Sequence, residues 1–306
     1  MVSSAKMSTL IFNWLLSVLS YFSIDCGAHR LWSHRSYKAK WQLRVLLAVF
    51  QTLTFQMDIY HWARDHRVHH VYSETDGDPH NAKRGFFFAH VGWLLCHRHP
   101  DVTRLGKKLD MSDLIGDPIV KYQHKFYYPL LILTWLTVPI SVPVYYFHET
   151  WLNSFLVNCF RFAITLQTTS LVNSLAHIGP GGRPYDKRIN PRETTAVSYL
   201  TFGEGYHNYH HAFPGDYSAS EYGWSDNWNP STAVIDMFAR IGWAYDRKAT
   251  PESVVRTRIE RTGDLAAKSP KLTMVYVWLD IVMGMFYVTW FVWLATLYNT
   301  TDISEN

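Results

Sequence analysis

Long apolar stretches separate the polar blocks of this chain. A membrane-spanning helix takes roughly 17–25 apolar residues, and three stretches fit or come close. The second and third are joined by only four residues, which predicts an antiparallel hairpin. Another stretch, residues 43–57, is shorter and flanked by charges, which favours an interfacial helix. The three predicted spans are residues 9–24, 127–147 and 152–178.

The polar blocks, residues 58–125 and 179–270, are rich in Lys and Arg, whereas the hairpin link contains neither. Basic loops remain in the cytosol, so both blocks should form one cytosolic cap, with the hairpin link and both termini on the other side. A glycosylation sequon at Asn299 agrees with a lumenal tail. We therefore expect an all-α fold in which multi-pass transmembrane helices carry a helical cytosolic cap.

Composition supports a membrane protein with a sizeable polar part. Of the 306 residues, 13 are Trp and 48% are hydrophobic, yet the mean hydropathy is only −0.12. The net charge of +4 does not indicate nucleic-acid binding. The cysteines Cys26, Cys96 and Cys159 form no CxxC pair, so neither a disulfide framework nor a zinc knuckle is expected.

Sixteen histidines stand out, and nine of them form four clusters. The motifs HRVHH (66–70) and HNYHH (207–211) place imidazoles at i, i+3 and i+4, which share one face of a helix. The motif HRLWSH (29–34) spaces two imidazoles five apart, about 140° around a regular helix, so we expect a helix end or a distortion there. The nine are His29, His34, His66, His69, His70, His177, His207, His210 and His211.

Nine imidazoles suffice for two metal ions with four or five nitrogen ligands each. Imidazole alone does not choose between Fe, Zn, Cu and Ni. A catalytic zinc uses about three protein ligands, so this set indicates a redox pair instead. Nearby carboxylates that are close enough in sequence to orient the imidazoles are Asp65, Glu74, Asp76, Asp78 and Glu204. Asp25 has three open roles: orienting His29, binding a metal or disturbing the site. The other histidines are expected to be hydrogen-bonded structural residues: His61, His80, His90, His97, His99, His124 and His148.

At these residues the chain closely resembles the membrane acyl-CoA desaturases of the stearoyl-CoA type. The resemblance covers about residues 9–265 and is specific in order and spacing. It rests on GAHRLWSHRSYKA (27–39), the block from Trp62 to Leu95, LVNSLAHIG (171–179), RPYDKRINPRE (183–193), GEGYHNYHHAFPGDYSASEY (203–222) and AYDRK (244–248).

The resemblance implies that the nine histidines hold two iron ions, with Asn173 bound through water. It implies a cis double bond, most commonly at Δ9, made in a saturated acyl-CoA with O2 and electrons from cytochrome b5 and its reductase. The family's location is the endoplasmic reticulum membrane, with the site facing the cytosol; a homo-oligomer is possible. Positions that touch substrate in the family correspond to Trp62, Arg64, Asp65, Trp93 and Arg98.

Departures from the family concern both ends of the chain. Only one predicted span precedes HRLWSH, where the family has two, so a first transmembrane helix is expected to be missing. We divide the chain into a desaturase domain, residues 1–270, and an extra C-terminal helix and tail, residues 271–306. The apolar segment 272–298, which contains Asp280, is hypothesised to pack where the missing span would lie.

Three alternatives remain open at this stage. A hydroxylase or acetylenase would use the same ligands. A metal transporter would need ionisable ligands deep inside its spans. An inactive relative would bind acyl-CoA or a partner desaturase without turnover. The sequence HIGPGG (177–182) does not match a haem-binding domain, so electrons are expected from a partner. By resemblance, Ser17 and Tyr21 approach the closed end of an acyl tunnel, and Arg161 should face the bundle or extend to the membrane surface.

Overall fold

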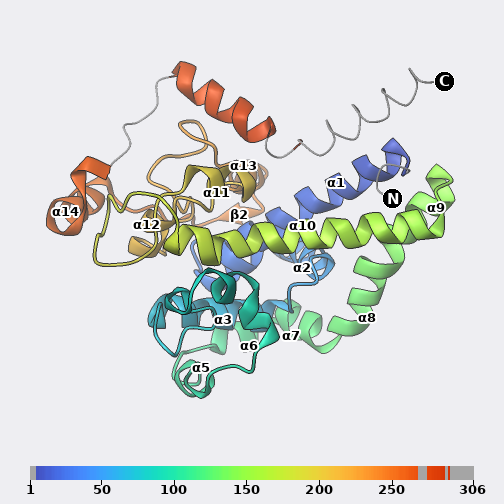
Figure 1. The fold of residues 1–306 in the computed structure, drawn as a ribbon, viewed down its shortest axis with the longest axis horizontal. Helices are drawn as coiled ribbons and strands as arrows, with labels where there is room; N and C mark the ends of the chain where they lie inside the picture. Colours follow the sequence, from blue (N-terminus) through green and yellow to red (C-terminus); the bar gives the residue numbers. More distant parts are fainter. Residues whose placement is uncertain (1–4, 268–273, 287–288, 290–306) are drawn as a thin grey trace.

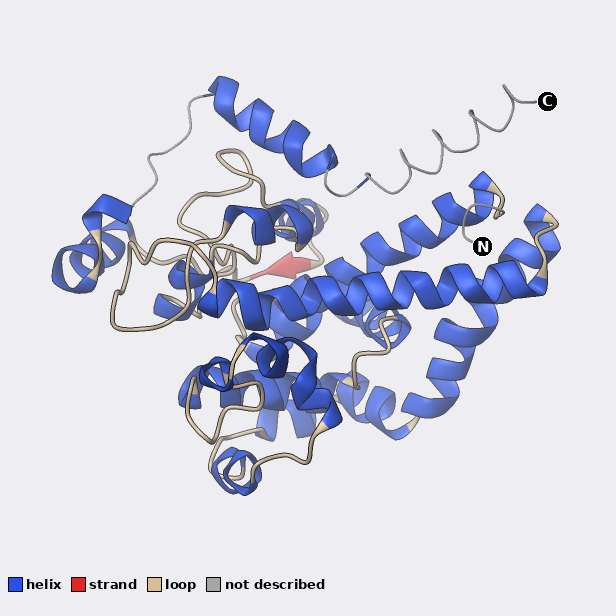
Figure 2. Cartoon of the chain, in the orientation of Figure 1, coloured by secondary structure: helices blue, strands red, loops and turns tan. Residues whose placement is uncertain are grey.

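The structure is a computed structural model that describes residues 5–267, 274–286 and 289 (Figure 1). Helices dominate it, and the described residues contain one small antiparallel sheet of two strands, β1 (Lys38–Ala39) and β2 (Ala244–Tyr245) (Figure 2). The α-helices are α1 (Met7–Phe22), α2 (Trp41–Leu53), α3 (Ile59–Tyr72), α4 (Trp93–Leu95), α5 (Pro100–Gly106), α6 (Ser112–Gly116), α7 (Pro118–Lys125), α8 (Tyr127–Leu131), α9 (Val138–Phe147), α10 (Trp151–Ile178), α11 (Thr195–Leu200), α12 (His207–Ala212), α13 (Pro230–Arg240) and α14 (Glu252–Thr262). Wider π-helical segments are Ser23–Ser33, Phe88–Gly92 and Ile132–Thr137, and 3-10 turns are Ala82–Arg84 and Leu265–Ala267.

Three helical stretches of the described chain are long and apolar enough to cross a membrane: Met7–Ser33, Tyr127–Phe147 and Trp151–Ile178. The last two form the predicted hairpin, which is therefore confirmed. The 28 residues of α10 extend about 42 Å at 1.5 Å per residue, more than the hydrocarbon thickness of about 30 Å. The C-terminal end of α10 therefore reaches beyond a bilayer core. Helix α2 has 13 residues and is too short to span, as predicted.

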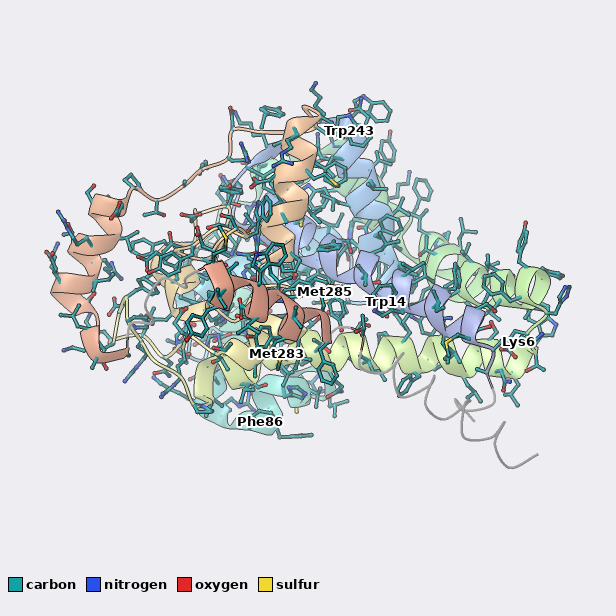
Figure 3. All side chains as sticks on the ribbon, turned by 90° about the horizontal axis from the view of Figure 1, so that it is seen from above. Lys6, Trp14, Phe86, Trp243, Met283 and Met285 are labelled. Carbon is teal, nitrogen blue, oxygen red and sulfur yellow. The ribbon has the colours of Figure 1, made fainter. Side chains whose placement is uncertain are left out.

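The start of α1 is bonded to the hairpin link. The backbone N–H of Lys6 donates to Glu149 Oε2 at 2.7 Å, and the Thr9 hydroxyl donates to the same oxygen at 3.1 Å. The Lys6 ammonium donates to the carbonyl of Phe147 at 3.0 Å. The N-terminal end of the first span and the hairpin link thus lie at one end of the molecule (Figure 1), and Lys6 marks that end in Figure 3.

The first span is longer than its prediction of residues 9–24. After α1 the helix continues through Ser33 as a π-helix, and His34 caps it. Ser23–Ser33 is buried throughout although it contains Asp25, His29 and Arg30. Because of these polar residues, a search for apolar stretches ends the span too early. The expected distortion at HRLWSH is confirmed.

The cap surrounds the end of the spans that lies opposite the start of α1 (Figure 1). Its main apolar core packs the π-helix Ser23–Ser33 against α2, α3 and α13, and α7 packs on α2 and α3. Central members of this core are Trp32, Leu43, Ile59, Leu114 and Ile235. Because this core contacts the π-helix directly, it fixes the end of the first span relative to the cap helices.

Arg161 faces the interior of the helix bundle, one of the two positions expected for it. Its side chain is 3% exposed. It donates to Asn158 Oδ1 at 3.0 Å, to Ser20 Oγ at 3.3 Å and to the carbonyl of Leu53 at 3.4 Å. These partners come from α10, α1 and the end of α2, so the guanidinium links three helices inside the membrane region.

The C-terminal apolar segment is described over Met274–Phe286, which is helical. Asp280 accepts hydrogen bonds from the Tyr199 hydroxyl and from the backbone N–H of Trp228. Both partners belong to the cap, so this part of the segment packs against the cap, a position that the sequence did not predict (Figure 1). Apart from residue 289, the rest of the predicted 272–298 helix lies outside the described residues, as do the C-terminal tail and the sequon at Asn299.

Candidate metal centre

Nine imidazoles from four separate segments meet where the spans enter the cap. The π-helix, α3, the end of α10 and α12 supply them. Their nitrogens form two groups, in each of which all candidate ligand atoms lie within 4.8 Å of one another. The first group is His29, His34, His66, His70 and His210, and the second is His69, His177, His207 and His211.

The two HxxHH motifs are shared crosswise between the groups. In α3 the i and i+4 histidines, His66 and His70, belong to the first group, and His69 belongs to the second. In α12 the assignment is reversed: His207 and His211 belong to the second group, and His210 belongs to the first. Each short helix therefore contributes to both groups. The two groups are also in direct contact, because the ring of His70 in the first group stacks on that of His211 in the second, at 4.1 Å between centroids.

The π-helix explains how HRLWSH supplies two ligands to one group. A π-helix closes its hydrogen bonds between residues five apart. Accordingly, the N–H of His34 donates to the carbonyl of His29 at 3.1 Å, and the two rings lie 4.8 Å apart between centroids. Two side chains five positions apart would point in different directions on a regular α-helix. The π-helical turn places both imidazoles on the same side.

The π-helix ends on the side chain of Arg67, which lies inside HRVHH. Its guanidinium donates to the carbonyls of Ser33 at 3.0 Å and Trp32 at 2.6 Å, two acceptors that a helix end leaves without partners. The same guanidinium is paired with Asp113 at 2.6 Å. Arg67 therefore fixes the end of the first span to the helix that carries three of the imidazoles.

Three carboxylates set the orientation of their imidazoles. Glu204 Oε2 lies 3.0 Å from Nδ1 of His29, Asp78 Oδ1 lies 2.9 Å from Nδ1 of His69, and Glu74 Oε1 lies 2.7 Å from Nδ1 of His177. A carboxylate accepts the Nδ1 proton and so leaves the Nε2 lone pair free to bind a metal. Glu74, Asp78 and Glu204 were among the carboxylates that the sequence offered for this role.

The Nε2 atoms have the spacing that metal ligands require. They lie 3.0 Å apart for His29 and His210, 2.8 Å for His34 and His66, and 2.9 Å for His177 and His207. Two ligands at right angles on bonds of about 2.1 Å would be separated by about 3.0 Å. The carboxylates orient His29 and His177 so that their Nε2 lone pairs point toward neighbouring nitrogens. Facing lone pairs repel each other, and a cation between them removes this repulsion. The donor set therefore fits two metal ions.

Protonation of three imidazoles outside the membrane spans is disfavoured. Burial, together with the neighbouring imidazoles, holds the pKa of His66, His70 and His210 well below the usual range. Burial would raise the pKa of Glu204, but Arg30 and His29 outweigh it and lower this pKa to about 2. At neutral pH these three imidazoles are thus neutral nitrogen donors, and the carboxylate of Glu204 is ionised.

Two residues of this centre were not singled out from the sequence as part of the site. Arg30 is 1% exposed and donates from Nε and Nη2 to Glu204 Oε1, at 3.0 and 2.7 Å. His80, expected to be structural, packs its ring against that of His69 at 4.3 Å between centroids and lies 3.7 Å from Asp78. A sequence signal existed for each, because Arg30 follows His29 directly and His80 follows HRVHH in the stretch DGDPH.

A cavity of about 40 Å3 adjoins both groups of imidazoles. Its lining includes Tyr21, Trp62 and Asn173 beside His29, His66 and His207. Trp62 stacks on His66 at 5.0 Å between centroids. Asp25 also lines the cavity, and it accepts from the Ser231 hydroxyl at 3.0 Å, so the carboxylate bonded to His29 is that of Glu204.

The remaining residues predicted to touch substrate lie in α3 or near it, and Asp65 is buried beneath the partly exposed Arg64 and Arg98. Arg64 and Arg98 both pair with Asp65, at 2.7 and 2.6 Å. Trp93 and Arg98 line a second small cavity of about 10 Å3. The structure thus joins Arg64, Asp65 and Arg98 directly and separates Trp93 from the cavity that Trp62 lines.

A family model described as fatty acid desaturase matches residues 7–222, a range that contains all nine imidazoles. The chain is also similar to characterised proteins over most of its length. It is 56% identical to an acyl-CoA Delta-9 desaturase of Acheta domesticus over 263 residues, which is 86% of this chain and 73% of that protein. It is 53% identical to stearoyl-CoA desaturase 2 of Mus musculus over 270 residues, 88% of this chain and 75% of the other.

A third relative differs from these in its stated specificity. The chain is 49% identical to an acyl-CoA Delta(11) desaturase of Spodoptera littoralis over 262 residues, 86% of this chain and 77% of that protein. Relatives of similar identity thus carry names with different double-bond positions.

Proposed function

This chain belongs to the fatty acid desaturase family, and from this membership we propose that it is a membrane acyl-CoA desaturase that makes a cis double bond in a saturated acyl chain. The observation that carries the proposal is the pair of imidazole groups within the matched range, next to a cavity that ligands of both groups line. The relatives named acyl-CoA desaturases support the substrate class. We favour Δ9 because the relative with 56% identity is named for that position.

We propose that the two groups hold one iron ion each. Imidazole suits iron, and neutral ligands leave the charge of the ions uncompensated. When bound, the iron pair would supply the oxidising power needed to remove hydrogen from unactivated C–H bonds. Asn173, which lines the cavity, is proposed to bind through water near the second group, the one with four imidazoles.

The protein itself positions the reactants. The acyl chain would occupy the cavity that Trp62 and Tyr21 line, and these side chains would keep water from the reacting carbons. The linked Arg64, Asp65 and Arg98, with Trp93 nearby, are proposed to bind the polar CoA portion, since guanidinium groups bind phosphate well. Binding at that surface would orient the thioester end and so determine which carbons lie at the imidazole groups.

The proposed reaction requires two electrons from an external donor. The saturated chain loses two hydrogens, and O2 accepts these together with two further electrons and two protons to form two waters. Cytochrome b5, served by its reductase, is the proposed source of the two electrons. The protein would reside in the endoplasmic reticulum membrane, with residues 58–125 and 179–270 as its cytosolic cap and residues 1–270 as the catalytic unit.

Expression in a yeast strain that lacks its own desaturase tests this function. We expect new monounsaturated fatty acids in the wild-type lipid profile, and none for the variant His211→Ala. Arg104→Ala, a change at an exposed residue of α5, is the matched control and should leave the profile intact. Hydroxylated acids instead would indicate a hydroxylase, and an unchanged profile with normal membrane expression would contradict the proposal.

A further inference from the structure

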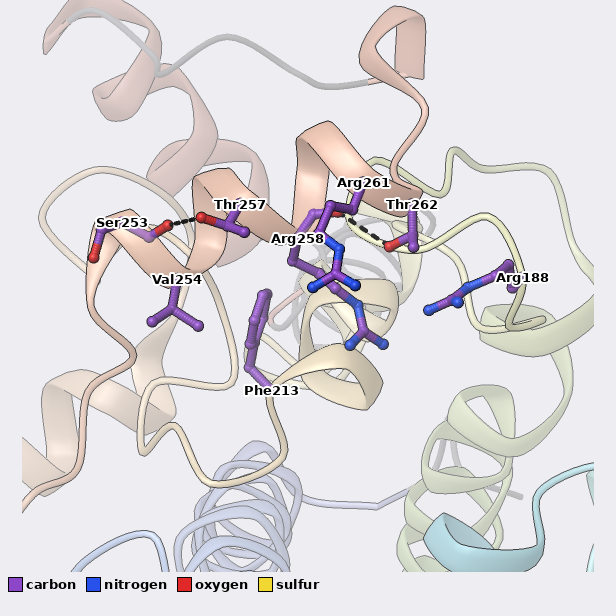
Figure 4. Close-up of a pocket in the computed structure, with 8 residues that line it drawn as sticks. All are labelled: Arg188, Phe213, Ser253, Val254, Thr257, Arg258, Arg261 and Thr262. Carbon is purple, nitrogen blue, oxygen red and sulfur yellow. Dashed lines mark hydrogen bonds between the residues drawn. The ribbon is translucent and has the colours of Figure 1, made fainter.

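An open cleft of about 390 Å3 lies on the cap between α14 and the loop that carries Arg188 (Figure 4). One face of α14 forms its wall, because Val254, Arg258 and Arg261 recur at the spacing of helical turns. We call it the arginine cleft, and its lining is Arg188, Phe213, Ser253, Val254, Thr257, Arg258, Arg261 and Thr262.

The arginine cleft carries excess positive charge. None of the described residues that line it is acidic, and the buried carboxylate of Asp186, next to the lining, pairs with Arg188 at 2.9 Å and with Arg258 at 2.6 Å. Arg261 has no carboxylate within 4 Å among the described residues. Three guanidinium groups thus face one carboxylate, and an exposed apolar side chain, Val254 at 49% exposure, lies at the edge. Charges around an apolar contact are typical of a protein-binding surface.

The adjoining buried face of α14 packs against the helix α12 that carries three of the imidazoles. Val255 and Ile259 of α14 are buried in a cluster with Tyr185, Tyr209 and Phe213. The rings of Tyr209 and Phe213 lie 4.9 Å apart between centroids. Tyr209 belongs to α12 between two of its imidazoles, and Phe213 caps that helix, two residues after His211. A side chain on the floor of the cleft is therefore separated from an imidazole by two peptide units.

We propose that the arginine cleft docks an acidic one-electron carrier protein and that Phe213 and α12 form its shortest route to the metal pair. This inference rests on the proposed function, which needs two external electrons per double bond. Each docking would oxidise the carrier by one electron, so two dockings serve one turnover. The net positive charge favours an acidic partner and raises its rate of association.

The test measures binding of the soluble haem domain of cytochrome b5 to the full-length, metal-loaded protein in nanodiscs. For Arg261→Glu we expect an association rate about tenfold lower than wild type at low ionic strength, with the difference shrinking as salt is added. Arg261→Gln should fall between the two. Lys107→Glu makes the same charge change at an exposed residue after α5 and should bind as wild type does.

A second measurement uses a haem domain whose carboxylates have been amidated. Its association rate with wild type should be no higher than the rate of the unmodified domain with Arg261→Glu. Equal association rates for wild type and Arg261→Glu, with normal metal content in both, would overturn the inference. The inference would also be overturned if Arg261→Glu weakened only the binding of the protein to vesicles rich in phosphatidylserine, because the cleft would then bind anionic lipid. If wild type forms double bonds in the yeast assay while these binding results fail, the docking inference alone is wrong.

Discussion

His34 donates its backbone N–H to the carbonyl of His29 at 3.1 Å, which places two imidazoles one π-helical turn apart. This turn explains a spacing that does not fit an α-helix. It also means that the first span carries its ligands at its very end. The packing of Arg67 on the last carbonyls holds the turn in place.

Glu204→Gln should weaken metal binding. Glu204 accepts from His29 and from the buried Arg30, so the amide would lose the charge that both partners face. Loss of such an orienting carboxylate lowers metal affinity about 10–100-fold. Metal content after dialysis, measured by elemental analysis, checks this. Glu260→Gln, on the exposed side of α14, is the control, and equal metal content in the two variants would contradict the assignment.

His69→Ala and His70→Ala should differ although the residues are adjacent. His70 is one of five imidazoles in its group, whereas His69 is one of four. We expect His69→Ala to lose most of one ion per chain and His70→Ala to retain more metal. Metal-to-protein ratios of the purified variants test the crosswise sharing. A larger loss for His70→Ala would argue against the grouping.

The metal-free protein should lose stability as the pH falls below about 6.5, the ordinary pKa of histidine. In the folded state the pKa of His66, His70 and His210 is lowered, so below pH 6.5 the unfolded chain binds more protons than the folded one. Thermal unfolding in detergent should therefore be steady between pH 7 and 8 and shift to lower temperature toward pH 5. A rise in unfolding temperature over that acid range would refute this sign.

Tyr21→Ala should lengthen the preferred acyl chain. Tyr21 lines the cavity beside the imidazoles, so removal of its ring would extend the space available to the end of the chain. Product lengths from gas chromatography of total fatty acids provide the measurement. Leu15→Ala, at an exposed position of the same helix, is the control. An unchanged product length for Tyr21→Ala would place the tunnel elsewhere.

Asp280→Ala should release the C-terminal helix from the cap. The carboxylate accepts from the Tyr199 hydroxyl and from the N–H of Trp228, and bonds to charged groups contribute about 1.5–3 kcal/mol each. Hydrogen–deuterium exchange over Met274–Phe286 should accelerate. The exposed Asp246, paired only with Lys38 among the described residues, supplies the control variant. Unchanged protection would mean that apolar contacts alone hold the helix.

Sequence patterns predicted the hairpin and the distortion at HRLWSH, because each depends on local spacing and length. Which imidazoles belong to which group was not predictable, since this depends on how α3 and α12 are rotated toward each other. Arg30 was missed because a basic residue beside a histidine motif usually suggests a solvent-exposed side chain, whereas here it is buried against Glu204. The role of Asp280 was hidden as well, since its partners are distant in sequence.

Crosswise sharing of the two HxxHH motifs has a consequence for assembly. Neither ion can bind fully until α3 and α12 have docked, and docking for one ion brings together most of the ligands of the other. Loading should therefore be cooperative, with singly occupied protein scarce during titration. Full metal binding during maturation would then occur only after the four ligand-bearing segments, which are distant in sequence, have folded together.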